Sequence, residues 1–214
     1  MPDHARGREI LAAAWLSRFG SPATTRELQA LAAVSLGESP YGHGTFRQLD
    51  HATGATIAEH RETHNWGAIQ CGTLPPCPPD CFIATDTHPG RGYYDACFRR
   101  WPTPEAGALA YLETLLIKRN REPVRRAISR GSAHAIASAM HATGYYEGAS
   151  TIPSRAIDLY ATAIARNGKN VAAFFGEPYY LSAGHDSGDE SLAMLGLVLG
   201  SFLLSLRGVV RRKK

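Results

Sequence analysis

The apolar positions divide the chain into helical stretches and one long segment without helical period. Apolar residues recur three to four apart over residues 10–19 and again over 25–37, which predicts two amphipathic helices. The second helix has a clear start, because Thr24 can cap it and Glu27 stands three residues later. This spacing is the capping-box arrangement. We expect this helix to end near Gly37.

Residues 43–101 have a different character. Helical period disappears, and Gly, Pro, Thr, Asp and His become frequent over these 59 residues. So long a stretch without helix in a compact domain is usually functional or locally cross-linked. Short strands are expected at 81–85 and 93–98, on either side of a Pro-Gly-Arg-Gly turn at 89–92. This pattern predicts a β-hairpin.

Helical period then returns. Thr103 can cap a helix, and Pro104 occupies a first-turn position that tolerates proline. Three further helices are predicted at about 122–129, 132–141 and 154–167, the last with Gly168 as its stop. The patterns together predict a mainly α (α+β) fold, in which a helical domain over residues 1–176 carries a small β-hairpin insertion.

The C-terminal part separates from this domain in composition. Residues 177–190 have the composition of a linker, and 191–210 form an apolar stretch followed by the basic tail 211–214. The apolar stretch predicts a transmembrane helix that anchors the chain in a lipid bilayer. Gly196 and Gly200 have a spacing that suits self-association of helices in lipid. The alternative is a buried C-terminal helix of the folded domain.

Composition and charge set broad limits. Hydrophobic residues make up 44% of the 214 residues and charged residues 20%, which is typical of a folded protein. The formal net charge is +4, and much of the basic excess lies in the last eight residues. No basic stripe with interleaved aromatic residues is present, so a nucleic-acid partner is not expected. The first residues lack the pattern of a signal peptide, so any export is expected to use another route.

Four cysteines fall within one window of 27 residues. An even number in a Pro-rich segment predicts two disulfides and an oxidising compartment. A four-thiolate zinc site and free thiols are the alternatives, although the spacings lack paired C-x2-C motifs. The histidines form no recognised ligand motif either, so no metal or cofactor is predicted. The four cysteines are Cys71, Cys77, Cys81 and Cys97.

Glu38 is the first candidate for chemistry. It stands at or just past the end of the second predicted helix, after a run of apolar residues. An acid at such a point can face a cleft, where partial desolvation raises its pKa as a general acid requires. Position alone favours the alternative of a solvated glutamate at a helix end, because most acidic residues lie on the surface.

Four short segments change that weighting. The sequences ESPYGHG at 38–44, NWGAIQ at 65–70, CFRRWPTPEAG at 97–107 and GYYE at 144–147 occur in this order. They resemble motifs of the lysozyme-like glucosaminidases of glycoside hydrolase family 73. The chain departs from the family pattern at Gly37, in the Pro-rich insertion that bears cysteines, and in the absence of a threonine from the last motif.

The resemblance implies a lysozyme-like helical fold with a β-hairpin beside a glycan groove. Glu38 would protonate the leaving oxygen. Asp86 would be the second carboxylate, with Asp95 and Asp80 as competitors. Tyr145 would lie near the catalytic acid, although a packing role is its alternative. Contacts with the sugars would come from Tyr41, Asn65, Trp66 and Gln70.

The function expected from these residues is hydrolysis of the β-1,4 glycosidic bonds of peptidoglycan, by a glucosaminidase or muramidase. A lytic transglycosylase that forms 1,6-anhydro products and a non-catalytic wall-binding protein are the alternatives. The apolar C-terminal stretch would hold the catalytic domain at a membrane, facing the cell wall. A virion-associated lytic enzyme of a phage fits this combination.

Overall fold

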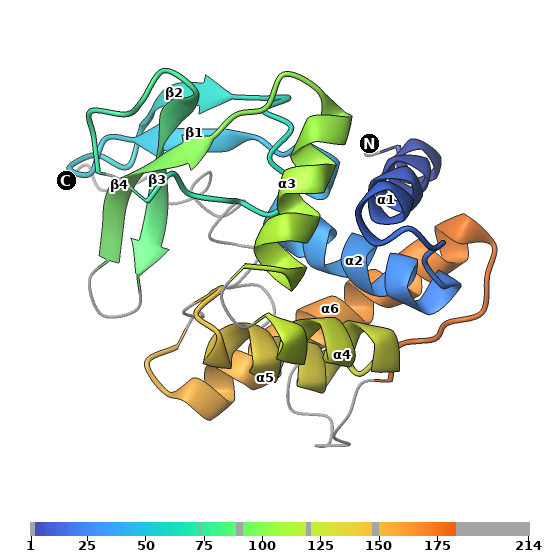
Figure 1. Ribbon diagram of the computed structural model, residues 1–214. Helices are drawn as coiled ribbons and strands as arrows, with labels where there is room; N and C mark the ends of the chain where they lie inside the picture. Colours follow the sequence, from blue (N-terminus) through green and yellow to red (C-terminus); the bar gives the residue numbers. More distant parts are fainter. Residues whose placement is uncertain (1–2, 73, 89–91, 119–120, 147–149, 183–214) are drawn as a thin grey trace.

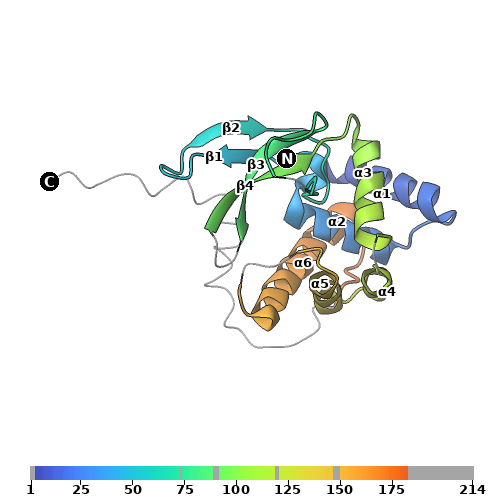
Figure 2. The ribbon, with the colours of Figure 1, turned by 60° about the vertical axis from the view of Figure 1, so that its left-hand side comes forward.

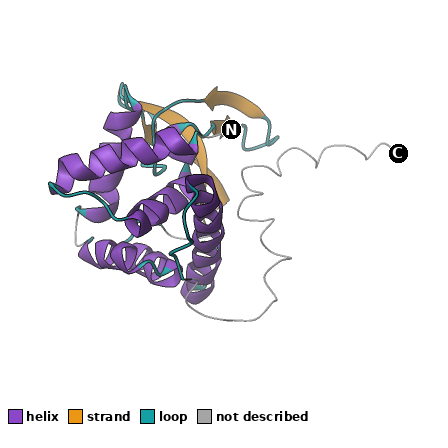
Figure 3. Cartoon of the chain, turned by 90° about the vertical axis from the view of Figure 1, so that its right-hand side faces the viewer, coloured by secondary structure: helices purple, strands orange, loops and turns teal. Residues whose placement is uncertain are grey.

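The structure, a computed structural model, describes residues 3–72, 74–88, 92–118, 121–146 and 150–182. These residues form a mainly helical body with two small antiparallel sheets, which confirms the predicted fold class at this level (Figure 1). The helices gather on one side and the strands on the other (Figure 3). The elements are α1 (His4–Phe19), α2 (Thr25–Glu38), the 3-10 turn η1 (Pro40–Gly42), β1 (Phe46–Leu49), β2 (Thr56–His60), β3 (Cys81–His88), β4 (Gly92–Arg99), α3 (Pro104–Leu116), α4 (Glu122–Arg130), α5 (Ala133–Ala142) and α6 (Pro153–Phe175).

Helix α2 forms the centre of the helical body. Every residue from Glu27 to Ser35 is buried, and α1, α4 and α6 pack around the helix. Its small alanine side chains let these neighbours approach closely. Polar side chains of the neighbours bond to its backbone: the Tyr111 hydroxyl donates to the Leu31 carbonyl at 2.9 Å. A helix buried on all sides fixes the position of whatever follows its C-terminus.

The helix starts predicted at Thr24, Thr103 and Ser132 are confirmed, whereas α1 begins at His4, earlier than its apolar pattern indicated. Thr24 and Glu27 form the capping box of α2, and α2 ends at Glu38. Thr103 caps α3 through the backbone N–H of Ala106, and Ser132 caps α5 in the same manner. These starts were predictable because the capping bonds are local in sequence.

The predicted end of the last helix is wrong. Helix α6 continues past Gly168 and ends at Gly176, which has the left-handed backbone that terminates a helix (φ 65°). Gly168 is instead a packing position, because a Cβ there would lie 2.6 Å from Cδ1 of Leu181. Leu181 is 1% exposed, so the first residues of the predicted linker pack onto the body.

The hairpin of β3 and β4 is confirmed, with Asp86 opposite Tyr94 in its register. A second hairpin, β1 with β2, was not predicted. Its strands have four and five residues and mostly half-buried or exposed positions, so they carry little apolar alternation. Both hairpins lie at the same end of the molecule, above α4, α5 and α6 and beside α3 in Figures 1 and 2.

Two disulfides join the Pro-rich segment to the β3–β4 hairpin. Cys71 pairs with Cys81, and Cys77 pairs with Cys97. This confirms the disulfide prediction over free thiols and a four-thiolate zinc site. The pairs interlock, so the 71–81 segment is held against the first residues of β3 and the last residues of β4.

The predicted membrane anchor lies outside the described residues. The residues outside the description are 183–190 of the linker, the apolar stretch 191–210 with Gly196 and Gly200, and the tail 211–214. Among the residues that the structure describes, no helix has the length and apolar character to cross a membrane.

Candidate active site

A cleft of about 510 Å³ separates the helices from the β3–β4 hairpin. Its helical wall is formed by the end of α2, by Thr114 of α3 and by the segments around Arg121 and Tyr145. Its hairpin wall is formed by β1, β3 and β4 together with Gln70. The two carboxyl groups that line the cleft, Glu38 and Asp86, come from opposite walls.

Glu38 is the last residue of α2 and is partly buried at the edge of the helical core. Burial is the main cause that raises the pKa of this carboxyl to about 7. A hydrogen bond donated by the Tyr160 hydroxyl to Oε1 opposes the rise, and the charge of Asp86 adds to it. Glu38 is therefore partly protonated at neutral pH, as a group that donates a proton must be.

Three tyrosines surround this carboxyl. Tyr160 of α6 contacts it directly, and the Tyr146 ring stacks on Tyr160 with centroids 4.2 Å apart. The Tyr145 hydroxyl donates to the Gly67 carbonyl at 3.1 Å, and both Tyr145 and Tyr146 line the cleft. Burial raises the pKa of all three phenols, so they remain protonated hydrogen-bond donors at neutral pH. The predicted Tyr145 is thus brought beside Glu38.

Tyr160 was not recognised from the sequence as a site residue. It lies at an apolar-face position of its helix, and a tyrosine there is usually a packing residue. No local pattern indicates that its hydroxyl reaches Glu38, which is 122 positions away in the sequence.

Asp86 projects from β3 on the hairpin wall. Its Oδ2 accepts hydrogen bonds from Gln70 Nε2 at 2.7 Å and from the Tyr94 hydroxyl at 3.2 Å. Its Oδ1 accepts from the backbone N–H of Thr87 at 2.7 Å. Three donors therefore orient this carboxylate within the cleft. Gln70, expected to bind substrate, lines the cleft and positions Asp86.

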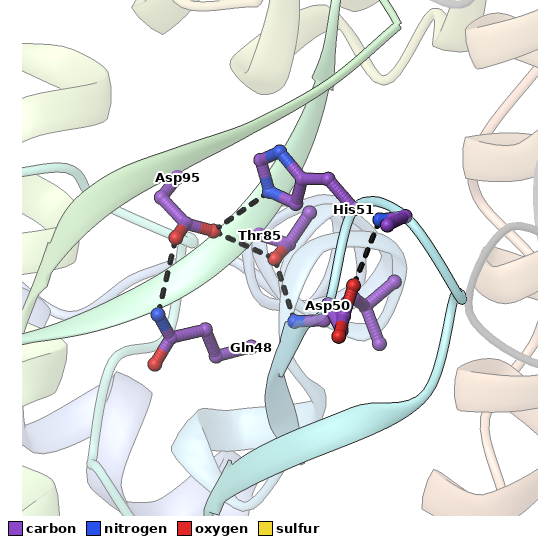
Figure 4. A network of polar contacts seen from close by, with 7 residues as sticks. Gln48, Asp50, His51, Thr85 and Asp95 are labelled. Atoms are coloured by element: carbon purple, nitrogen blue, oxygen red, sulfur yellow. Dashed lines mark hydrogen bonds and ion pairs between the residues drawn. The ribbon is translucent and has the colours of Figure 1, made fainter.

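The two competitors of Asp86 have other partners. Figure 4 shows the Asp95 carboxylate bonded to Gln48 (3.1 Å), His51 (3.2 Å) and Thr85 (2.9 Å). This network joins the two hairpins. Burial raises the pKa of Asp95, but these hydrogen bonds outweigh it and the net pKa is lowered.

Asp80 forms an ion pair with Arg99, with Oδ2 and Nη1 2.6 Å apart. Of the three candidate aspartates, only Asp86 is among the residues that line the cleft.

Three predicted substrate contacts do not reach the cleft. Tyr41 and Trp66 are 1% and 0% exposed and pack against each other with ring centroids 5.4 Å apart. The Tyr41 hydroxyl bonds to Nδ1 of His4 at 2.9 Å, on the side of α1. A fully buried tryptophan cannot stack on a sugar, so the structure gives both residues a packing role instead of the predicted one.

Asn65 is also buried and has a structural role. Its Nδ2 donates to the carbonyls of Ile69 and Arg99, both at 3.0 Å, and its Oδ1 accepts from the Ile69 N–H at 2.7 Å. These bonds shape the loop that brings Gly67, Ala68 and Ile69 to the cleft. The resemblance motifs thus contribute scaffolding as well as site residues.

The turn after Glu38 is fixed by close packing. Gly42 has φ 75°, and a Cβ there would lie 2.6 Å from Cα of His64. Only glycine permits this approach between the segment that carries Glu38 and the one that carries Asn65.

Arg121 is a site residue that the sequence did not indicate. It is 9% exposed, it lines the cleft, and its guanidinium lies 5.4 Å from the centroid of the Tyr145 ring. It donates to the Thr143 hydroxyl. A cation held over Tyr145 favours anionic or strongly polar groups in this part of the cleft.

Comparisons extend these observations no further. No protein-family model, curated protein or solved structure matches this chain. Among the described residues, no group of three or more His, Cys, Asp or Glu side chains is arranged to hold a metal ion. The assignment of function therefore depends on the geometry of the cleft.

Proposed function

We propose that this chain is a glycoside hydrolase that cleaves the β-1,4 bonds of the peptidoglycan glycan strand. The observation that carries the proposal is the pair of unlike carboxyl groups that face one cleft. Glu38 is partly desolvated, with a pKa of about 7, and Asp86 accepts three hydrogen bonds. Glycosidic cleavage typically uses two carboxyl groups in different environments, one as proton donor and one as carboxylate, on either side of the sugar.

The proposed chemistry begins with protonation of the glycosidic oxygen by Glu38. The bond from the anomeric carbon to that oxygen breaks, and positive charge develops on the sugar ring. Water then bonds to the anomeric carbon. Its proton passes to Asp86 or, where Asp86 only stabilises the cation, to the Glu38 carboxylate. The Tyr145 and Tyr146 side chains line the cleft, and the Tyr145 hydroxyl, which donates to the Gly67 carbonyl, can still accept a hydrogen bond from a substituent of the sugar.

The choice of peptidoglycan as substrate rests on the resemblance of four segments to lysozyme-like glucosaminidases. Segments 38–44, 65–70 and 144–146 all meet at the cleft or directly beneath it. The positive charge of Arg121 in the cleft also favours a polar, anionic polymer as the ligand. The same resemblance makes a lysozyme-like fold part of the proposal.

A lytic transglycosylase is the second candidate. It is favoured by the engagement of Asp86 with Gln70 and Tyr94, because a transglycosylase needs no second carboxylate to activate water. The mass of the products separates the two reactions. Hydrolysis adds one water to each cleaved bond, whereas transglycosylation leaves a 1,6-anhydro sugar.

The decisive test is Glu38→Gln, assayed on purified sacculi by turbidity loss and by mass spectrometry of the released fragments. We expect a rate loss of about 10²–10⁴-fold, because the amide cannot donate the proton. Glu113→Gln is the matched control, since Glu113 is exposed on α3 and does not line the cleft. Wild-type rates in Glu38→Gln would contradict the proposal, and sacculus binding without cleavage by either protein would indicate a wall-binding protein.

A further inference from the structure

An arginine-rich surface lies at the end of the molecule away from the hairpins. We call it the arginine face, and it consists of Arg26 of α2 with Arg125, Arg126 and Arg130 of α4, all exposed. In Figures 1 and 2, α4 lies at the bottom and the strands at the top. The α4 helix is strongly amphipathic, with Val124, Ala127 and Ile128 buried and the arginines outward.

Few carboxylates balance these charges. Glu122 pairs with Arg125 at 2.9 Å, and Glu27 is buried where it accepts from the Ser129 hydroxyl at 2.6 Å. Arg26, Arg126 and Arg130 make no ion pair with any other residue that the structure describes. Arg126 and Arg130 stand four apart on one helix, and like charges at this spacing disfavour the helix. The charge of Arg126 acts on Glu122, whose pKa is lowered mainly by its bond to Arg125, and Arg130 stands in the last helical turn, where a cation is favourable. The four arginines still outnumber Glu27 and Glu122, the carboxylates that line the same surface, and this excess of positive charge favours an external anion.

Two hollows of about 380 and 430 Å³ mark the arginine face. The bond between Glu27 and Ser129 separates them, because both residues line both hollows. Arg26 and Tyr180 line the first, and the three α4 arginines line the second. Forked guanidinium groups in such hollows complement the paired oxygens of a phosphodiester.

Ser182, the last residue that the structure describes, lies beside the arginine face. The Ser182 N–H donates to the Gly131 carbonyl at 2.8 Å, directly after Arg130. The Arg26 side chain covers the same glycine, since a Cβ on Gly131 would lie 2.6 Å from its Cδ. Residues 183–190 lead from this point to the apolar stretch 191–210.

We propose that the arginine face binds the anionic headgroups of a phospholipid membrane. Its charge, its hollows and its position beside Ser182, the last described residue before the apolar stretch in the sequence, all favour this partner. The inference does not depend on the proposed enzyme activity. It has a geometric consequence, because α2 runs from Arg26 to Glu38, about 18 Å at 1.5 Å per residue. Contact through the arginine face would hold the cleft away from the lipid and toward the wall.

Hydrogen exchange of the full chain on vesicles tests this proposal. We expect α4 amides to exchange several-fold more slowly on vesicles with a third phosphatidylglycerol than on pure phosphatidylcholine, and the difference to shrink in high salt. Arg126→Glu with Arg130→Glu should abolish the difference. Arg61→Glu with Arg155→Glu, the same charge change elsewhere on the exposed surface, should preserve it. Arg126→Gln with Arg130→Gln provides a second variant if the reversal disturbs folding.

Equal exchange on both vesicle types would overturn the proposal, as would a difference that persists in both the Glu and the Gln variants of Arg126 with Arg130. Inorganic phosphate without vesicles is the remaining arm. If it slows α4 exchange as much as the anionic vesicles do, the ligand is free phosphate and the membrane assignment is wrong.

Discussion

The two walls of the cleft are built by different means. The helical wall belongs to the main core, where α2 is buried on all sides and ends at Glu38. The hairpin wall has only a small core of its own, made by Phe46, Phe82, Phe98 and two alanines. Because so small a core gives little stabilisation by burial, the hairpin wall is also held by two disulfides and by the hydrogen-bond network around Asp95. One wall is held by burial and the other by cross-links.

The carboxyl groups follow the same division. Glu38 emerges from a desolvated core, which raises its pKa to about 7. Asp86 stands on a hairpin where Gln70, Tyr94 and the Thr87 N–H supply donors. Because each wall holds one of the two carboxyl groups, the difference between the walls is enough to give these groups different proton affinities.

The largest expected effect comes from removing a cross-link of the hairpin wall. Cys77→Ser with Cys97→Ser opens a link that spans 20 residues, and we expect it to lower the free energy of unfolding by about 3 kcal/mol. Hydrogen exchange should show a larger loss of protection in β3 and β4 than in α2, which shares only the loss through global unfolding. Equal loss of protection in α2 would contradict the division between the walls.

Asp86→Asn tests the chemistry of the hairpin wall. We expect about a 10²-fold lower rate of sacculus cleavage with little change in stability, because the side chain is partly exposed and its shape is kept. Asp95→Asn is the matched control. It should lower the free energy of unfolding by about 1–2 kcal/mol through the network of Figure 4 and affect the rate less. An unchanged rate in Asp86→Asn would favour the transglycosylase, for which Glu38 alone suffices.

The sequence predicted the helical wall better than the hairpin wall. Helix starts depend on bonds between residues three apart, so the caps at Thr24, Thr103 and Ser132 were predictable. The β1–β2 hairpin was missed because short, half-exposed strands carry little pattern. Gly168 was misjudged because the sequence alone does not distinguish a glycine that ends a helix from one that admits Leu181.

The site was predictable only in part for a related reason. The motifs located Glu38, Asp86, Gln70 and Tyr145, which all line the cleft. They did not separate these residues from Tyr41, Asn65 and Trp66, whose side chains are buried beneath it. Tyr160 and Arg121 reach the cleft through long-range packing, which no local pattern reports.

A smaller effect concerns the cost of burying Glu38. Its pKa is 4.5 in the unfolded chain and about 7 in the folded protein, so the folded state binds more protons between these values. The stability that protonated Glu38 contributes is therefore complete below pH 4.5 and is lost as the pH rises through 7. Glutamine does not ionise, so Glu38→Gln keeps its stability as the pH rises. After allowance for partial exposure, we expect this variant to be about 1–2 kcal/mol more stable than wild type at pH 8.

Denaturant unfolding at several pH values measures this difference. At pH 4 the two proteins should have nearly equal stability, because Glu38 is then protonated in both states. Glu113→Gln should show no such pH dependence relative to wild type. If the stability difference between Glu38→Gln and wild type is no larger at pH 8 than at pH 4, burial does not raise the pKa of the Glu38 carboxyl. The contrast between the two walls then loses its electrostatic part.

The smallest effect separates burial from hydrogen bonding at Glu38. The Tyr160 hydroxyl lowers the pKa that burial has raised, so Tyr160→Phe should raise it further. The alkaline limb of the kcat/KM profile would then move to higher pH, while the rate at the optimum changes less than about tenfold. Tyr179→Phe is the control, since that hydroxyl donates to the Ala165 carbonyl and not to a carboxylate. An alkaline limb that stays in place in Tyr160→Phe would mean that a group other than Glu38 sets it.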